Sequence, residues 1–201
     1  MNDYESVEQL VLGERDARGR GLHDKMVKSY WPDATVSTSW ISGSATDYIN
    51  AGHGRNLRPE ASANERIVGS TSPVIIHING TRAYAELPVE ANHWITVNGE
   101  NAVWTSYMKL LYRCEKRDGE WRISDLTSIF NNDKLAPVVP GTDLHIDPDD
   151  LKGLRSAYLW MSYIRKSDGG SVSQDLPGTD QPEKIDKIYQ YDEEWINEGS
   201  K

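Results

Sequence analysis

Hydrophobic positions near the start of the chain recur at helical spacing and predict an amphipathic first helix. Asn2 and Glu5 have the spacing of a capping box, in which each residue satisfies a backbone N–H group of the other. Val7, Leu10 and Val11 then form an apolar stripe three to four residues apart. The sequence therefore predicts that the chain opens with a helix that packs one face on a core.

The next segment predicts a second helix and a short strand. Leu22, Met26 and Tyr30 line one helical face, and Pro32 is expected to end that helix. Apolar and polar side chains then alternate over residues 36–40, as they do in a half-buried strand. This order places helical structure before most of the strands.

The middle of the chain has the pattern of an antiparallel meander. Asn-Gly or Asp-Gly pairs at 79–80, 98–99 and 118–119 supply the positive φ angles of tight hairpin turns. Long runs rich in Val, Ile, Thr, Tyr and Trp lie between them. We predict four strands, at about 67–78, 81–97, 100–117 and 120–130.

The last third predicts a helical extension. Residues 137–148 have the composition of a linker, and helices are expected at about 150–166 and 182–197. This part is too small for a domain of its own, so it must pack on the sheet or on a partner subunit. We expect an α+β fold with a domain at 1–140 and an extension at 141–201.

The hairpin turns also predict which side chains share a face of the sheet. If each turn has two residues, His93 lies opposite Trp104, and Tyr112 lies opposite Asp125. One face then combines small and apolar residues with a few polar groups. The polar groups expected on this face are His93, Ser106, Tyr112, Asp125 and Thr127.

An apolar face with sparse polar groups is typical of a ligand pocket, and here Trp104 and Met108 would form part of its wall. Two simpler interpretations remain open. A single His on an apolar face is often a satisfied core or rim residue, and Asp125 can cap a loop or pair with an Arg. A bulge in any strand would also move the residues beyond it to the other face.

Composition and charge exclude several functional classes. The chain has 201 residues and a formal net charge of −9, without the basic stripe that nucleic-acid binding requires. No apolar run reaches the length of a membrane span, and the acidic start does not resemble a signal peptide. The single cysteine, Cys114, agrees with a cytoplasmic location. No nucleotide-binding or metal-binding motif is present, so we expect no cofactor and no metal.

Several short motifs resemble the SnoaL-like branch of the nuclear-transport-factor-like superfamily. They are found, in chain order, at residues 30–36, 78–83, 117–123 and 133–138, which read YWPDATV, INGTRA, RDGEWRI and DKLAPV. The resemblance covers roughly residues 3–140. It implies a cone-shaped α+β barrel with a cavity between the helices and the concave sheet face. It also implies a homodimer formed through the convex sheet faces.

The resemblance implies chemistry as well. The superfamily includes enzymes similar to scytalone dehydratase, ketosteroid isomerase and polyketide cyclases, together with non-enzymatic binding modules. A family Tyr–Asp pair after the first helix leaves Asp16 as its only counterpart here, and a family His falls at about Asn92 or His93. The family His that opens the first long strand is absent, because residues 67–71 read IVGST.

The leading hypothesis is a cofactor-independent lyase or isomerase that acts on a small apolar polycyclic or polyketide-like molecule. His93 would transfer the proton, and Asp125 or Asp16 would orient or share it. Tyr30 and Tyr112 would donate hydrogen bonds to a carbonyl or enolate oxygen. The expected substrate-binding residues are Tyr30, Trp40, His53, Trp104, Ser106, Met108 and Tyr112. The alternatives are a non-catalytic binding protein and a structural dimer module whose pocket is filled by its own side chains.

Overall fold

The first helix has the predicted capping box. The computed structural model describes residues 2–52 and 66–198, and its helix α1 is Asp3–Gly19. The Glu5 backbone N–H donates to Oδ1 of Asn2 at 2.9 Å, and the Asn2 N–H donates to Oε2 of Glu5 at 3.0 Å. Val7 and Val11 are fully buried, which confirms the apolar stripe. His53, one of the expected binding residues, lies outside the described residues.

The second helix ends earlier than the sequence pattern predicted. Helix α2 is His23–Ser29, and Tyr30 begins strand β1, Tyr30–Ser37. Pro32 disfavours the helical conformation of Trp31, the residue before it. The chain is extended one residue earlier still, at Tyr30, which has φ −112° and ψ 146°. Strand β2, Ser42–Ser44, and helix α3, Ala45–Gly52, follow.

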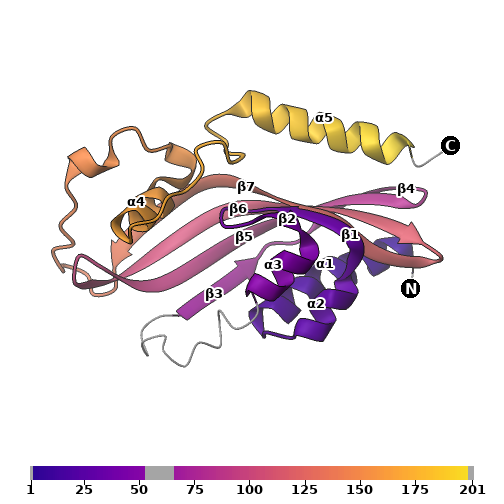
Figure 1. The fold of residues 1–201 in the computed structure, drawn as a ribbon, viewed down its shortest axis with the longest axis horizontal. Helices are drawn as coiled ribbons and strands as arrows, with labels where there is room; N and C mark the ends of the chain where they lie inside the picture. The colour runs from indigo at the N-terminus through magenta and orange to yellow at the C-terminus, as the bar shows by residue number, and fades with distance from the viewer. Residues whose placement is uncertain (1, 53–65, 199–201) are drawn as a thin grey trace.

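The strands form one open, mixed sheet, which confirms the α+β class. Its order is β2-β1-β7-β6-β5-β3, with β4 also paired to β5, and β1 runs parallel to β7 while the other pairs are antiparallel (Figure 1). The bounds are β3 Arg66–Thr71, β4 Ile75–Asn79, β5 Arg82–Val97, β6 Glu100–Arg117 and β7 Glu120–Pro137. The expected first long strand is divided at 72–74, around Pro73, which has no N–H group for the ladder.

The register predicted for β5 and β6 is confirmed, because His93 pairs with Trp104 and Ala91 with Ser106. The register predicted for β6 and β7 is wrong beyond Ile123. A bulge between Arg113 and Cys114 adds one residue to β7, so Tyr112 pairs with Leu126.

The bulge moves Asp125 and Thr127 to the convex face of the sheet. Asp125 pairs with Arg113, and its Oδ1 lies 2.7 Å from that guanidinium. Leu126 takes the core position instead and is fully buried. A second irregularity between Tyr107 and Met108 restores the original parity, so Asp133 pairs with Ser106.

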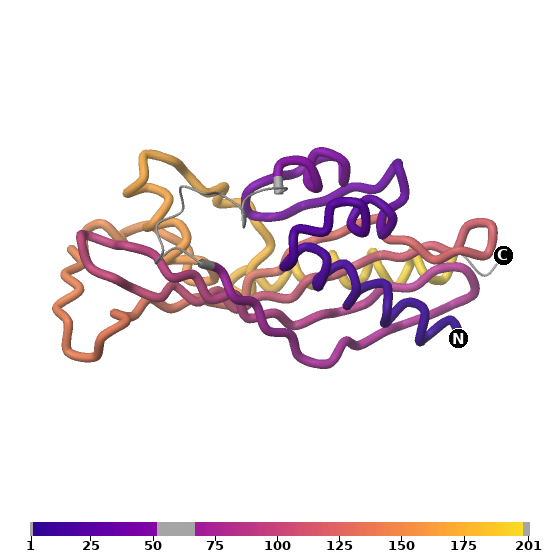
Figure 2. Tube along the Cα trace, turned by 90° about the horizontal axis from the view of Figure 1, so that it is seen from below, coloured from indigo at the N-terminus to yellow at the C-terminus, as the bar shows by residue number. Residues whose placement is uncertain are grey.

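The N-terminal helices cover the end of the concave face that lies near the β4–β5 and β6–β7 turns. Figures 1 and 2 show α1, α2 and α3 together on one side of the sheet and α5 on the other. Val7 and Val11 of α1 belong to the same core as Ala83, Ala85 and Tyr112 of the sheet. The small alanines allow the helix to approach the strands closely, so this part of the face is packed rather than open.

The C-terminal extension covers the far part of the same face, around α4 at the other end of the long strands (Figure 1). Helix α4 is Leu159–Ser167, shorter than predicted, because short 3-10 turns replace its expected first half. Tyr158 and Met161 pack with Phe130, Trp104 and Met108 of the sheet.

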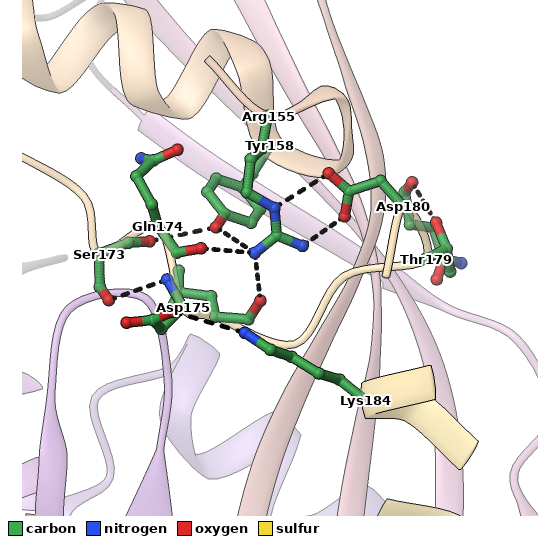
Figure 3. Close-up of polar contacts among 10 residues, drawn as sticks. Arg155, Tyr158, Ser173, Gln174, Asp175, Thr179, Asp180 and Lys184 are labelled. Atoms are coloured by element: carbon green, nitrogen blue, oxygen red, sulfur yellow. Dashed lines mark hydrogen bonds and ion pairs between the residues drawn. The ribbon is translucent and has the colours of Figure 1, made fainter. Parts of the chain in front are cut away.

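A single arginine fastens this extension. Arg155 donates to both carboxylate oxygens of Asp180, to the carbonyl oxygens of Gln174 and Leu176 at 2.8 Å, and to the Tyr158 hydroxyl at 2.7 Å (Figure 3). The hydrogen bonds from Arg155, together with its charge, lower the pKa of the Asp180 carboxyl. The cluster closes the loop between α4 and α5 around one cation.

Helix α5, Pro182–Glu198, packs on the convex face of the sheet. Its Ile196 is buried with Tyr84, Leu111 and Ile129. The expected homodimer through this face stays a prediction. Because α5 covers the convex face around Tyr84, Leu111 and Ile129, an interface at that part of the face would include α5. None of the described helices is long and apolar enough to cross a membrane.

Candidate functional site

A fully buried glutamate of α1 forms the centre of a polar cluster between the N-terminal helices and the sheet. The Tyr30 hydroxyl donates to Oε1 of Glu14 at 3.1 Å, and the Tyr112 hydroxyl donates to Oε2 at 3.1 Å. Nε of Arg18 also donates to Oε1, at 3.3 Å. We call Glu14, Arg15, Arg18, Tyr30, Tyr48 and Tyr112 the glutamate–tyrosine cluster.

Two arginines supply the positive charge of the glutamate–tyrosine cluster. Arg15 lies one residue beyond Glu14 and brings its guanidinium to 3.8 Å from Oε2. Arg18 packs flat on the Tyr48 ring, with 3.6 Å from its central carbon to the ring centre. Trp40 also stacks on Tyr48, with 5.1 Å between the two ring centres. The buried carboxylate is thus balanced by cations and enclosed by aromatic rings.

The tyrosines of the cluster stay protonated at neutral pH. Burial, followed by the negative charge of Glu14, raises the pKa of Tyr30 and of Tyr112 well above 10. Burial and the Glu14 charge also raise the pKa of Tyr48. Each phenol has a single proton to donate, and in Tyr30 and Tyr112 that proton is directed at Glu14.

The Glu14 carboxylate has more acceptor positions than the donors that surround it in the described residues. An ionised carboxylate has about four acceptor positions, and Tyr30, Tyr112 and Arg18 occupy three. Arg15, at 3.8 Å, is too far away to form a hydrogen bond with Oε2. Among residues 2–52 and 66–198, no donor occupies the remaining acceptor position, which is on Oε2.

Of the expected site residues, Tyr30, Tyr112 and Trp40 lie in or against this cluster. Asp16 does not, because its side chain is exposed on the outer side of α1, where it pairs with Arg20 at 3.0 Å. Asp125 is on the convex face, on the other side of the sheet from Tyr112, as a result of the bulge. The placement expected for Asp125, on the apolar face, is therefore wrong, and the exposed Asp16 side chain is not part of the cluster.

His93 lies far along the same face from Tyr112. Tyr112 pairs with Ala85, and His93 is eight residues further along β5, which at about 3.3 Å per residue is roughly 26 Å. The His93 and Trp104 rings stack with 4.2 Å between their centres. His93 and Tyr112 therefore cannot act on the same bond.

Trp104, which stacks on His93, helps to attach helix α4 to the sheet. Nε1 of Trp104 donates to Asp133 at 3.1 Å, and Asp133 accepts the backbone N–H groups of Trp160 and Met161 at 3.0 and 2.7 Å. Asp133 thus satisfies the free N–H groups of the first turn of α4. Ser106, also expected in the pocket, is buried at the same level of the sheet. Met108 contacts both the N-terminal core and this C-terminal one.

The sequence contained a signal for Glu14 that a search for apolar residues misses. Val7, Val11 and Glu14 follow one another at helical spacing, so the apolar stripe of α1 continues onto a carboxylate. A charged residue on the buried face of a helix requires a partner inside. Within residues 2–52 and 66–198, no group of three or more His, Cys, Asp or Glu side chains is arranged to hold a metal ion.

Known proteins share both the sequence pattern and the fold. Pea pathogenicity protein 2 of Fusarium vanettenii is 26% identical over 174 residues, which cover 83% of this chain and 74% of that protein. An uncharacterised protein of Emericella nidulans is 26% identical over 180 residues, covering 84% and 75%. The hexachlorocyclohexane dehydrochlorinase LinA-type3 of Novosphingobium barchaimii has a similar fold, with a TM-score of 0.53, 17% identity and coverage of 72% and 94%.

The family model of the SnoaL-like domain matches residues 1–127, which include helices α1 to α3, strands β1 to β6, the start of β7 and the glutamate–tyrosine cluster. This match agrees with the motifs that suggested the family and with the helices packed on a curved sheet. The chain belongs to the SnoaL-like domain family.

Proposed function

We propose that the chain is a cofactor-independent enzyme that moves a proton on a small apolar polycyclic or polyketide-like molecule, with Glu14 as the base. The observation that carries this proposal is a fully buried carboxylate, held by two phenols and an arginine, with one acceptor position left. Membership of a family that includes possible enzymes of this type supports it.

The proposed step is proton abstraction beside a carbonyl group. The C–H bond breaks, its proton passes to Oε2 of Glu14, and its electron pair moves onto the carbonyl oxygen as an enolate. The Arg15 guanidinium lies 3.8 Å from Oε2 and would stabilise the enolate. Return of the proton to another carbon gives an isomer, and loss of a β-hydroxyl as water gives a dehydration.

The hydrogen bonds change the roles expected for the tyrosines. Tyr30 and Tyr112 were expected to donate to the substrate, but both donate to Glu14. In the proposal they hold the carboxylate in place, so they are positioning residues. Arg15 and Trp40 are partly exposed, so in the proposal a substrate approaches Glu14 past these two side chains.

Exchange of α-protons tests this proposal without knowledge of the natural substrate. The bicyclic ketone 2-tetralone exchanges its α-protons in D₂O, and NMR measures how much the protein accelerates this above buffer. Glu14→Gln keeps the shape but not the basicity, and should lower the acceleration by about 100-fold or more. His93→Ala, roughly 26 Å away along β5, should leave it unchanged.

The opposite pattern, with His93→Ala inactive and Glu14→Gln active, would place the chemistry near α4. A second candidate function is a non-catalytic binding protein, and one observation favours it: the cluster satisfies most of its own hydrogen bonds. Binding of 2-tetralone without acceleration of exchange in the wild-type protein would support that candidate. We also propose a homodimer and a cytoplasmic location, and light scattering after gel filtration tests the dimer.

A further inference from the structure

A cleft lies on the convex side of the sheet, beneath α5. It has a volume of about 300 Å³, at the lower end of the range for sites that bind small molecules. Strands β6 and β7 form its floor, and α5 forms its roof. The polar residues that line it are Arg113, Asp125, Thr127, Lys187, Tyr191 and Asp192.

Asp192 is the unusual group in this cleft, because it is a buried carboxylate with an unused oxygen. The residue is 2% exposed, and its Oδ2 is buried with no hydrogen-bond partner in the part of the chain that the structure describes. Its Oδ1 lies 3.7 Å from Nε of Arg113, too far away for a hydrogen bond. Buried carboxylate oxygens are normally satisfied, so Oδ2 indicates a missing donor.

Arg113 does not supply that donor, because another carboxylate holds it. Its guanidinium lies 2.7 Å from Oδ1 of Asp125, and the same Oδ1 accepts the Thr127 hydroxyl at 3.1 Å. Arg113 carries one positive charge, while Asp125 and Asp192 together carry two negative charges when ionised. These three side chains therefore carry a sum of one negative charge around Asp192, and the exposed Lys187 is the other charged residue that lines the cleft.

We propose that this cleft binds a small molecule through an ammonium group, which Asp192 receives on Oδ2. An ammonium group donates three hydrogen bonds and carries a positive charge, so it can satisfy the unpartnered oxygen of the buried Asp192 carboxylate. Its source is either a simple amine or an α-amino acid. In an amino acid the carboxylate would extend toward Lys187, an exposed residue at the cleft with no ion pair among the described residues. The sheet separates this site from the glutamate–tyrosine cluster, so the two proposals stand independently.

Calorimetric titration of the full chain with isopentylamine, L-leucine and isopentanol at pH 8 tests the proposal. We expect isopentylamine to bind and isopentanol, which has the same carbon skeleton without the charge, to bind at least 10-fold more weakly. Asp192→Asn should lose at least 10-fold in affinity for the amine. Asp186→Asn, an exposed change on the same helix, is the matched control and should bind as the wild type does.

Leucine distinguishes the two sources of the ammonium group. If the ligand is an amino acid, leucine binds more tightly than isopentylamine, and Lys187→Met removes this advantage without weakening the amine. If it is a simple amine, leucine binds no more tightly and Lys187→Met has no effect on either. Both results support an ammonium site.

The wild-type protein provides a further test without a substitution. Burial raises the pKa of Asp192 to about 6; Arg113 lowers it, and Asp125 and Glu86 raise it further. The carboxylate is therefore mostly protonated at pH 5, and amine affinity should fall at least several-fold between pH 8 and pH 5. Absence of amine binding at 10 mM, equal binding of isopentanol, or full affinity in Asp192→Asn would each overturn the proposal.

Discussion

Replacement of Asp192 by Asn should stabilise the protein at neutral pH, although it removes a charged residue that faces an arginine. The pKa of this carboxyl is raised from 3.8 to about 6, first because burial disfavours its charged form. A difference of about two pKa units corresponds to roughly 3 kcal/mol between the two protonation states. Asn resembles the protonated carboxyl in shape and cannot ionise.

The sign follows from the direction of the shift. The folded chain holds the Asp192 proton more tightly than the unfolded chain does, so this carboxyl contributes stability below about pH 4. That contribution is lost as the pH rises through about 6. At pH 8, Asp192→Asn should therefore exceed the wild type by up to about 3 kcal/mol in free energy of unfolding, and at pH 4 the two should be nearly equal.

Urea unfolding of both proteins from pH 4 to pH 8 measures this difference, and the subtraction removes the contributions of all other titrating groups. If α5 detaches before the rest unfolds, the same difference appears in the hydrogen-exchange protection of the α5 amides. A variant that is less stable than the wild type at pH 8, or a difference that does not change with pH, would refute the argument. The first result would mean that attraction to Arg113 outweighs the cost of burying the charge.

Two further predictions concern packing and hydrogen bonding. Gly178→Ala should destabilise by about 1–3 kcal/mol, because a Cβ there would lie 2.7 Å from Cβ of Ala157. Thermal unfolding measures it against the helical control Gly13→Ala, which has open space and should gain up to about 1 kcal/mol. Tyr112→Phe should cost about 1–3 kcal/mol in urea unfolding, since it removes a donor from the buried Glu14. An unchanged midpoint in Tyr112→Phe would mean that water replaces the phenol.

The fold was largely predictable because its signals are local. The capping box at Asn2 and the hairpin turns at 98–99 and 118–119 each depend on a few adjacent residues, and the turn at Asn98 sets the whole β5–β6 register. The turn expected at 79–80 lies one residue later, because Asn79 ends β4 and pairs with Arg82. The irregularities of β7 were not predictable from such signals. The residue added at Ser124 is an ordinary strand residue in sequence, and its effect appears only as a pairing between distant residues.

The candidate site was less predictable than the fold, because residues on the same face of a sheet need not lie in the same pocket. His93 and Tyr112 do share the concave face, as alternation required. His93 and Tyr112 are nevertheless roughly 26 Å apart along this face, and different helices pack on its two ends. The N-terminal helices pack over Tyr112, whereas α4 packs beside Trp104.

Side-chain alternation therefore gives the direction in which a residue points but not its neighbours along the strand. The neighbours depend on which helix reaches which level of the sheet, and that is a tertiary property. Glu14 illustrates the same limit from the helix side. It continues the buried stripe of Val7 and Val11, yet its role follows only from the two phenols that meet it there. A charged residue in line with an apolar stripe is thus a better pointer to a buried site in this fold than a polar residue on a long strand.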